Sequence, residues 1–209
     1  MNRKRWFFVI VAGIVLVGFV ILRTSLARRG VRDRSEIASQ PGAVSYPEGT
    51  TTVPELFDEA RSLVENGKRS DAEAVYRKIV ELEPNNAPGY IGLASCRVSQ
   101  GDLEKAEKHY RRALSIDPDS SMAMLGLGSV AYSRSEHSAA LDFYRKALAT
   151  YPDLPDAHWG LAITYDAMGD STNAALHYDK FLKLAPQSNL AKTARDRLKE
   201  TQRPVGPRQ

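Results

Sequence analysis

The feature of this sequence that most constrains its fold is an internal repeat with an unbroken period. Proline recurs at equal intervals, at Pro84, Pro118, Pro152 and Pro186. The segments around these prolines align without a gap, as residues 53–86, 87–120, 121–154 and 155–188. A unit as short as this cannot bury its apolar side alone, so the period predicts units that stack on their neighbours and share one continuous core.

Three further columns repeat with the same period. Alanine recurs at Ala72, Ala106, Ala140 and Ala174. Tyrosine follows four residues later, at Tyr76, Tyr110, Tyr144 and Tyr178. A small residue recurs at Ala60, Ala94, Gly128 and Ala162. Small, aromatic and proline positions in this order resemble the tetratricopeptide repeat (TPR) family over residues 53–188. The resemblance implies an all-α fold, an α-solenoid of four helix pairs.

Each repeat is predicted to contain two helices separated by a short turn, for example residues 87–100 and 103–116. Glycine occupies this turn at Gly67, Gly101 and Gly169, where its backbone freedom ends the first helix. The third repeat has Ser135 at this position, so we expect its turn to be less sharply specified. The repeated proline ends the second helix, because it lacks an amide donor and biases its predecessor away from helix.

A capping helix is predicted over residues 189–201, after the fourth repeat. Leu190, Ala194 and Leu198 are four residues apart, and mainly charged residues fill the other positions. Such a helix turns an apolar face towards the array and a charged face towards water, as the end of a solenoid requires. Residues 202–209 are predicted to form a disordered tail.

The amino-terminal residues predict a membrane segment. Residues 1–5 form a basic n-region, and residues 6–22 contain no charged side chain. As a helix, these seventeen residues span roughly 25 Å, near the lower limit for crossing a bilayer. We therefore expect a single-pass transmembrane helix or signal-anchor, followed by a basic and flexible linker over residues 23–52. A signal peptide cleaved after Ala27 is the alternative, and the positive charges leave the orientation of the body open.

The distribution of charge argues against a nucleic-acid partner. Residues 1–34 carry eight basic side chains and one acidic, whereas residues 35–209 carry 21 basic and 24 acidic. The net charge of +4 therefore belongs to the amino terminus, and the repeats lack the basic surface that phosphate binding needs. The single cysteine, Cys96, excludes an intramolecular disulfide and a multi-cysteine metal site.

No catalytic apparatus is recognisable, so we expect a protein that is not an enzyme and needs no cofactor. The sequence has neither an HExxH motif nor a phosphate-binding loop, and the repeat columns account for Gly126 and Gly128. The histidines are interpreted as separate, exposed helical residues that do not share a metal site. They are His109, His137, His158 and His177. Whether His158 or Trp159 faces inwards is left open.

The resemblance to the family implies that the first helix of each repeat lines a concave, protein-binding groove. The fifth, ninth and twelfth repeat positions would face the ligand. The fifth positions are Phe57, Ile91, Leu125 and Trp159. The ninth positions are Arg61, Ser95, Ser129 and Ile163, and the twelfth are Val64, Val98, Tyr132 and Asp166. Alternatively, the fifth-position side chains pack mainly between neighbouring first helices and expose little.

The sequence thus favours a membrane-tethered scaffold or adaptor for protein–protein interaction. Its groove would bind an apolar segment of a partner protein, in the assembly of a membrane or envelope complex. Two alternatives remain open. The chain could be a self-associating architectural protein, and thus a homo-oligomer, or a non-catalytic accessory subunit of an envelope enzyme or secretion machine.

Overall fold

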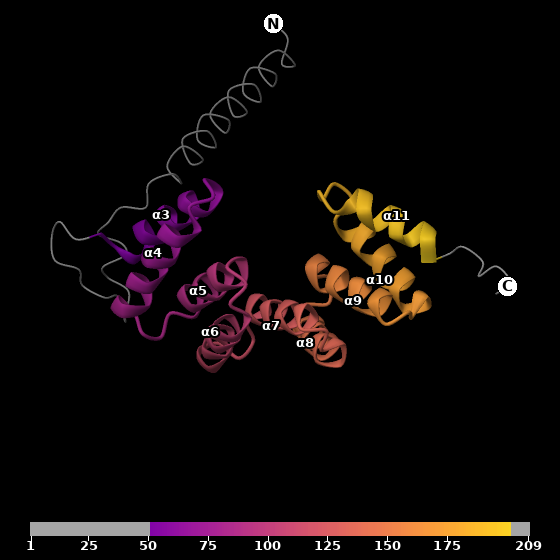
Figure 1. Ribbon diagram of the computed structural model, residues 1–209, viewed down its shortest axis with the longest axis horizontal. Helices are drawn as coiled ribbons and strands as arrows, with labels where there is room; N and C mark the ends of the chain where they lie inside the picture. The colour runs from indigo at the N-terminus through magenta and orange to yellow at the C-terminus, as the bar shows by residue number, and fades with distance from the viewer. Residues whose placement is uncertain (1–50, 202–209) are drawn as a thin grey trace, which may run out of the picture. The chain divides into compact units, whose positions relative to one another are not determined.

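A computed structural model describes residues 51–201, which fold as nine α-helices (Figure 1). The first helices of the four pairs are α3 (Val53–Glu65), α5 (Ala87–Ser99), α7 (Ser121–Ser133) and α9 (Pro155–Ala167). The second helices are α4 (Arg69–Leu82), α6 (Leu103–Ile116), α8 (His137–Thr150) and α10 (Ser171–Leu184). The ninth helix is α11 (Ala191–Thr201). The predicted all-α solenoid of paired helices with a carboxy-terminal helix is therefore confirmed.

The helices pack as a chain of neighbours. Each first helix packs against the second helix of its own pair, and each second helix packs against the next first helix. First helices also contact one another directly, α5 with α7 and α7 with α9. Within residues 51–201 the second helices make no comparable contact among themselves. The first helices therefore lie closer together than the second helices do, and they form the inner side of the stack.

Side-chain caps fix where several helices begin. The Oδ1 of Asn86 accepts the N–H of Gly89 at the start of α5, at 2.8 Å. The Oδ1 of Asp102 accepts the N–H of Lys105 at the start of α6, at 3.2 Å. Each such cap satisfies an amide that the helix itself leaves unpaired, which stabilises the helix by about 0.5–2 kcal/mol.

The turn inside each pair uses a left-handed residue. Gly67, Gly101 and Gly169 have φ between +73° and +78°, and Ser135 adopts the same region at +62°. The N–H of Ser135 donates to a carbonyl three residues back, as does that of Gly101. The expectation of a less sharply specified third turn is therefore wrong, because serine reproduces the glycine geometry at a strain of about 1–2 kcal/mol.

Consecutive pairs interlock through tyrosine and glycine. In the first three pairs, the repeated tyrosine of the second helix lies with its ring against a glycine sixteen residues later, in the next first helix. A Cβ at any of these glycines would lie within 3 Å of the ring, so no larger residue fits without a shift. The tyrosine–glycine pairs are Tyr76 with Gly92, Tyr110 with Gly126, and Tyr144 with Gly160. The repeat columns thus account for these glycines.

The α11 helix closes the far end of the core. It packs on α10, and its Ala194 belongs to the same buried cluster as Tyr178 and Phe181. An ion pair of 2.6 Å joins Arg197 of α11 to Asp166 of α9. The prediction began this helix at residue 189, two residues earlier than the observed start.

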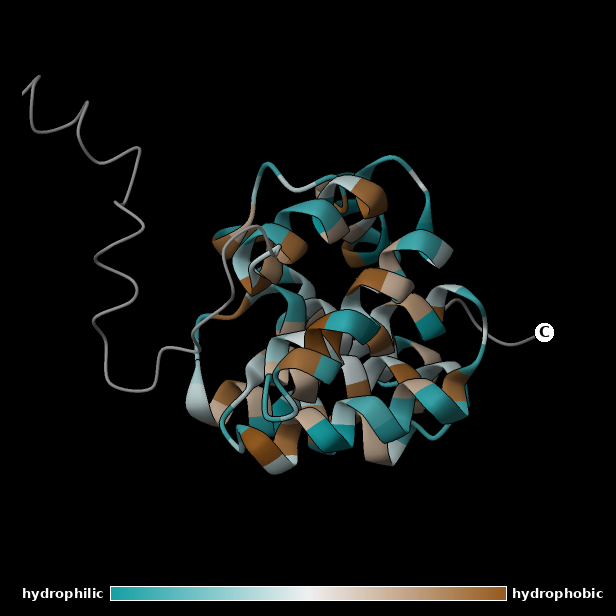
Figure 2. Cartoon of the chain, turned by 90° about the vertical axis from the view of Figure 1, so that its left-hand side faces the viewer, coloured by the Kyte–Doolittle hydropathy of each residue, from teal (hydrophilic) through white to brown (hydrophobic). Residues whose placement is uncertain are grey.

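The predicted membrane segment lies outside the described residues. So do residues 1–5, residues 23–50 of the predicted linker and the predicted tail 202–209. The helices in view in Figure 2 mix hydrophobic and hydrophilic residues along their length. None of the helices of residues 51–201 is long and apolar enough to cross a membrane.

Candidate protein-binding groove

A cleft of about 610 Å³ opens among the first three helix pairs. Helices α3, α4 and α5 supply most of its wall, and the turn between α6 and α7 supplies the rest together with Tyr151, the residue that ends α8. Since α3 and α5 are first helices, the cleft lies on the inner side of the stack. This position is where the family resemblance places a ligand groove.

The floor of the cleft is apolar. The rings of Phe57 and Tyr76 meet edge to face, with centroids 6.1 Å apart. Beside them lie Ile91, which is 9% exposed, and Gly92, whose missing side chain makes room for the Tyr76 ring. These residues come from three helices, so the floor exists only when the first two pairs are stacked.

The rim of the cleft leaves large apolar side chains in contact with water. Val64 is 40% exposed, Met122 64% and Tyr151 50%. Seven large hydrophobic residues are exposed within residues 51–201, and these three are among them. Scattered single apolar residues are ordinary on a surface, but three around one concave site indicate a binding surface.

Charged residues lie at two places on the cleft wall. Asp117 and Asp119 are in the turn that leads into α7, and Arg69 begins α4. The backbone N–H of Asp119 donates to the Oδ1 of Asp117 at 3.3 Å. Among residues 51–201, none of the three side chains has an ion-pair partner. Their charges are therefore available to a ligand.

The cysteine in the cleft wall is chemically quiet. Cys96 is 3% exposed, and burial, reinforced by the negative charge of Glu73, raises the pKa of its thiol. A thiol with a raised pKa is protonated at neutral pH and is a poor nucleophile. Cys96 therefore contributes packing to this site.

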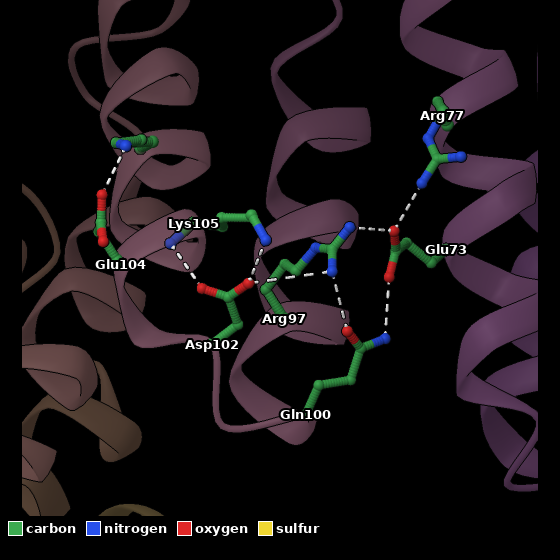
Figure 3. Close-up of polar contacts among 8 residues, drawn as sticks. Glu73, Arg77, Arg97, Gln100, Asp102, Glu104 and Lys105 are labelled. Atoms are coloured by element: carbon green, nitrogen blue, oxygen red, sulfur yellow. Dashed lines mark hydrogen bonds and ion pairs between the residues drawn. The ribbon is translucent and has the colours of Figure 1, made fainter.

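The acidic group nearest this cysteine is held in a structural clamp. Glu73 of α4 is 6% exposed and accepts hydrogen bonds from Arg77, Arg97 and Gln100 at 2.6–2.8 Å (Figure 3). Arg97 and Gln100 belong to the next pair, so the clamp joins α4 to the end of α5. The carboxylate of Glu107 joins α6 to Arg134 in the same way, at 2.5 Å. These groups are already paired and serve the junctions between repeats.

The cleft contains four of the twelve predicted groove residues. They are Phe57, Val64, Ile91 and Ser95. The other eight lie outside it, namely Arg61, Val98, Leu125, Ser129, Tyr132, Trp159, Ile163 and Asp166. The cleft is therefore confined to the earlier repeats and does not follow the predicted ladder to its end.

The later fifth-position residues also serve the core. Trp159 packs edge-on against Tyr178, at 5.8 Å between centroids, and against Phe181 at 5.4 Å. Leu125 is half-buried against two core clusters. At the twelfth position, Asp166 accepts the hydroxyl of Tyr178 and pairs with Arg197. Trp159 thus packs on the second helix of its own pair, and Asp166 is held by α10 and α11.

The other cleft residues were not among the predicted groove positions. Those that carry the chemistry of the site are Arg69, Tyr76, Asp117, Asp119, Met122 and Tyr151. Tyr76 belongs to the repeated tyrosine column, and the others lie in or next to turns. The turn around each repeated proline was the available signal, because it leads directly into the next first helix.

Two histidines correct the interpretation of separate, exposed helical residues. The Nδ1 atoms of His158 and His177 lie 3.0 Å apart, and His158 is only 4% exposed. The Nε2 of His158 lies 3.2 Å from the carbonyl oxygen of Pro152, and the ring of Tyr165 stacks on His177. His158 therefore faces inwards, while Trp159 is half-buried. The sequence did not predict the contact between His158 and His177 because the two rings come from different helices.

The environment of this pair favours neutral rings. Burial, followed by the neighbouring His158 and the positive charges of Lys180 and Arg145, lowers the pKa of His177 to about 4. Burial also lowers the pKa of His158. Two neutral imidazoles can share one hydrogen, whereas charging either would leave a buried cation. Over residues 51–201, no group of three or more His, Cys, Asp or Glu could hold a metal ion.

Sequence comparison identifies the repeats. Two family models, both described as tetratricopeptide repeat, match the chain, one over residues 57–121 and 97–155 and the other over residues 156–188. The chain belongs to the tetratricopeptide repeat family. TPR proteins are generally non-catalytic scaffolds, and this chain is a TPR scaffold for protein–protein interaction. No curated protein sequence matches the chain.

Solved structures share the same fold. A thermophilic TPR protein from Thermus thermophilus is 25% identical, with a TM-score of 0.64 over 74% of this chain and 83% of that one. The MamA protein is 24% identical, with a TM-score of 0.55 over 71% and 85% of the two chains. A TPR protein from Parabacteroides merdae is 22% identical, with a TM-score of 0.57 over 71% and 59%.

Proposed function

We propose that this TPR protein is a membrane-tethered scaffold that holds an apolar segment of a partner protein in the cleft of its first three helix pairs. The observation that carries the proposal is the rim of this cleft. Val64, Met122 and Tyr151 keep 40–64% of their surface exposed around an apolar floor. A partner that covers them removes this surface from water, which is the main driving force for association.

The energetics require a segment rather than a single side chain. Burying one aromatic side chain removes about 150–250 Å² from water, a gain of roughly 4–6 kcal/mol. Association itself costs an estimated 4–15 kcal/mol. A single anchor therefore barely offsets the loss of freedom, so a specific partner must contact floor and rim together.

The remaining predicted positions extend this surface along the inner helices. Ser129 of α7 is exposed, while Tyr132 and Ile163 are half-buried on α7 and α9. A longer partner could lie across them after leaving the cleft. In this proposal the cleft is the anchor and the later repeats give additional contacts.

The membrane tether rests on the sequence of residues 6–22. Seventeen consecutive residues without a charge follow a basic segment, as in a signal-anchor. Alkaline extraction of native membranes tests the tether. The full chain should stay in the pellet, and a variant lacking residues 6–22 should move to the supernatant. Release of the full chain by alkali would contradict the tether.

Site-specific photo-crosslinking in the native membrane tests the groove. A photoreactive residue at Met122, on the rim, should give a discrete adduct with one partner. The matched control is Leu176 of α10, which is 49% exposed but does not line the cleft. Equal adducts at both positions, or none at Met122, would exclude the cleft as the binding site. An adduct of twice the chain mass would favour the self-associating alternative.

A further inference from the structure

We propose that the occupant of the cleft is an extended segment of about six residues that is apolar in the middle and oppositely charged at its two ends. Its basic end lies at Asp117 and Asp119, and its acidic end lies at Arg69. This inference rests on the proposed function and specifies the chemistry of the partner.

The charged residues of the cleft lie at opposite ends of it. Three-residue turns make the helices of each pair antiparallel, so all the first helices run in the same direction. Asp117 and Asp119 precede the start of α7, whereas Arg69 follows the end of α3. One end of the cleft is therefore acidic and the other basic. The thirteen residues of α5 separate these ends by about 20 Å.

The two ends are free to bind because no described residue neutralises them. Of the described residues that line the cleft, Arg69, Asp117 and Asp119 are the charged ones. Within residues 51–201 none of them has an ion-pair partner, whereas Glu73 and Glu107 nearby are clamped by arginines. Unpaired charges on the wall of a binding cleft give it specificity for a ligand of complementary charge.

The span of the cleft suits an extended ligand. A helix about 10 Å wide would contact the cleft with only one face. An extended segment rises about 3.3 Å per residue and covers about 20 Å with about six residues. Its alternate side chains would point towards Phe57, Tyr76 and Ile91 on the floor.

Both signs of charge are needed for this assignment. Residues 53–188 carry 15 basic and 20 acidic side chains, so their overall field attracts any basic peptide. Arg69 adds a local preference that the overall field lacks, because it repels a second basic residue at its own end. A segment with one charge of each sign fits both ends of the cleft.

Peptide binding to the full chain in detergent micelles tests the charge pattern. The probes are blocked hexapeptides with Phe and Leu in the middle, carrying Lys at one end and Glu at the other, in both chain directions. Comparison peptides carry two Lys, two Glu or two Gln at these ends. One of the two mixed-charge peptides should bind about tenfold more tightly than the Gln peptide, since each exposed charge pair contributes about three- to fivefold.

Substitutions at the charged residues of the cleft test the role of each end in peptide binding. Asp117→Asn combined with Asp119→Asn should lower the affinity for that mixed-charge peptide about threefold and leave the Gln peptide unchanged. The matched control is Asp153→Asn, because Asp153 occupies the same turn one repeat later and does not line the cleft. Arg69→Gln should cost a similar factor through the acidic end, with Lys68→Gln, the neighbouring exposed lysine, as its control.

The results separate this inference from the proposed function. Equal affinity for all charge patterns, an equal loss in the Asp153 control, or no binding at about 1 mM peptide would overturn the inference. In each of these cases a discrete crosslink at Met122 would leave the scaffold function standing. Absence of that crosslink would remove the scaffold function, whatever the peptides do.

Discussion

At the scale of single residues, chemically similar side chains have different roles in this protein because their surroundings differ. Glu73 is almost fully buried and holds two helix pairs together, whereas Asp117 and Asp119 remain unpaired among the described residues and face a cleft. His158 and His177 share a hydrogen bond in the fourth pair, although their rings belong to different helices. Residue type alone would not separate these roles.

The histidine pair predicts a dependence of stability on pH. Because the pKa of folded His177 is about 4 and that of an unfolded histidine is about 6.5, the unfolded chain binds the proton first as pH falls. Stability should be complete above pH 6.5 and decline towards pH 4. Since the site is partly exposed to solvent, we expect the loss to be about 1–2 kcal/mol.

Replacing one ring isolates this effect from other titrating groups. In His177→Asn the amide can still hydrogen-bond to His158 but does not titrate. The denaturant midpoint of the variant should fall less between pH 6.5 and 4 than that of the wild type. Parallel curves for the two proteins would show that the pair does not contribute to the pH dependence.

At the scale of helices, the junctions between pairs combine a buried packing contact with a polar clamp. The packing contact is a tyrosine ring against a glycine, as with Tyr110 and Gly126. The polar clamp is a glutamate of the second helix that binds a side chain near the end of the next first helix. The third junction lacks the clamp, since Leu141 stands where Glu73 and Glu107 do, and Arg145 donates to the hydroxyl of Tyr165 at 2.6 Å instead.

Removing the first clamp should destabilise the junction between α4 and α5. Glu73→Ala removes the carboxylate that lies 2.6 Å from the guanidinium of Arg97, which is 22% exposed, and leaves it, among the described residues, only the carboxylate of Asp102 at 4.0 Å. Loss of one partner from a buried pair costs about 3–5 kcal/mol, and the residual exposure of Arg97 reduces our expectation to about 2 kcal/mol. Chemical unfolding should show this as a lower midpoint.

The matched control uses an exposed pair. Glu104 binds Lys108 with both side chains about 70% exposed, so Glu104→Ala should change stability by less than about 1 kcal/mol. Helix propensity changes equally in the two variants. Similar losses of stability in the two variants would mean that the buried Glu73 clamp stabilises the protein no more than the exposed pair does.

The junctions also show what could be predicted from sequence. The repeat period predicted the helix pairs, because its tyrosine and alanine columns report packing between neighbours. The four-residue spacing of Leu190, Ala194 and Leu198 predicted the α11 helix. The cleft was only partly predictable. Tyr151 and Phe57 come from the third and first pairs, and the rotation between successive pairs that brings them to one site is not encoded in any single column. The contact between His158 and His177 could not be predicted from the sequence, because it depends on where the two side chains lie in space.

At the scale of the whole described stack, stability is a sum over neighbours. Each helix pair contacts only the pairs next to it, and α11 covers the last one. In such an array the loss of one terminal unit mainly destabilises the unit next to it. The described repeats therefore differ from a globular domain, in which the loss of one element destabilises the entire core.

Removal of the α11 helix tests this behaviour. A chain ending at Ser188 would uncover Tyr178 and Phe181, each 1% exposed in the intact protein. Amide hydrogen exchange should accelerate in α9 and α10, while exchange in α5 and α6 changes little. Equal acceleration in every helix would instead indicate a single cooperative unit.

The pairing of tyrosine with glycine has a consequence for how such a chain can evolve. The second helices α4, α6 and α8 present the same ring to the same kind of notch, and α11 presents Ala194 in the buried cluster that contains the last ring. Duplicating or deleting one whole unit would therefore place a tyrosine ring against a small residue again at the splice. The number of units can change by recombination while the inner surface simply lengthens or shortens.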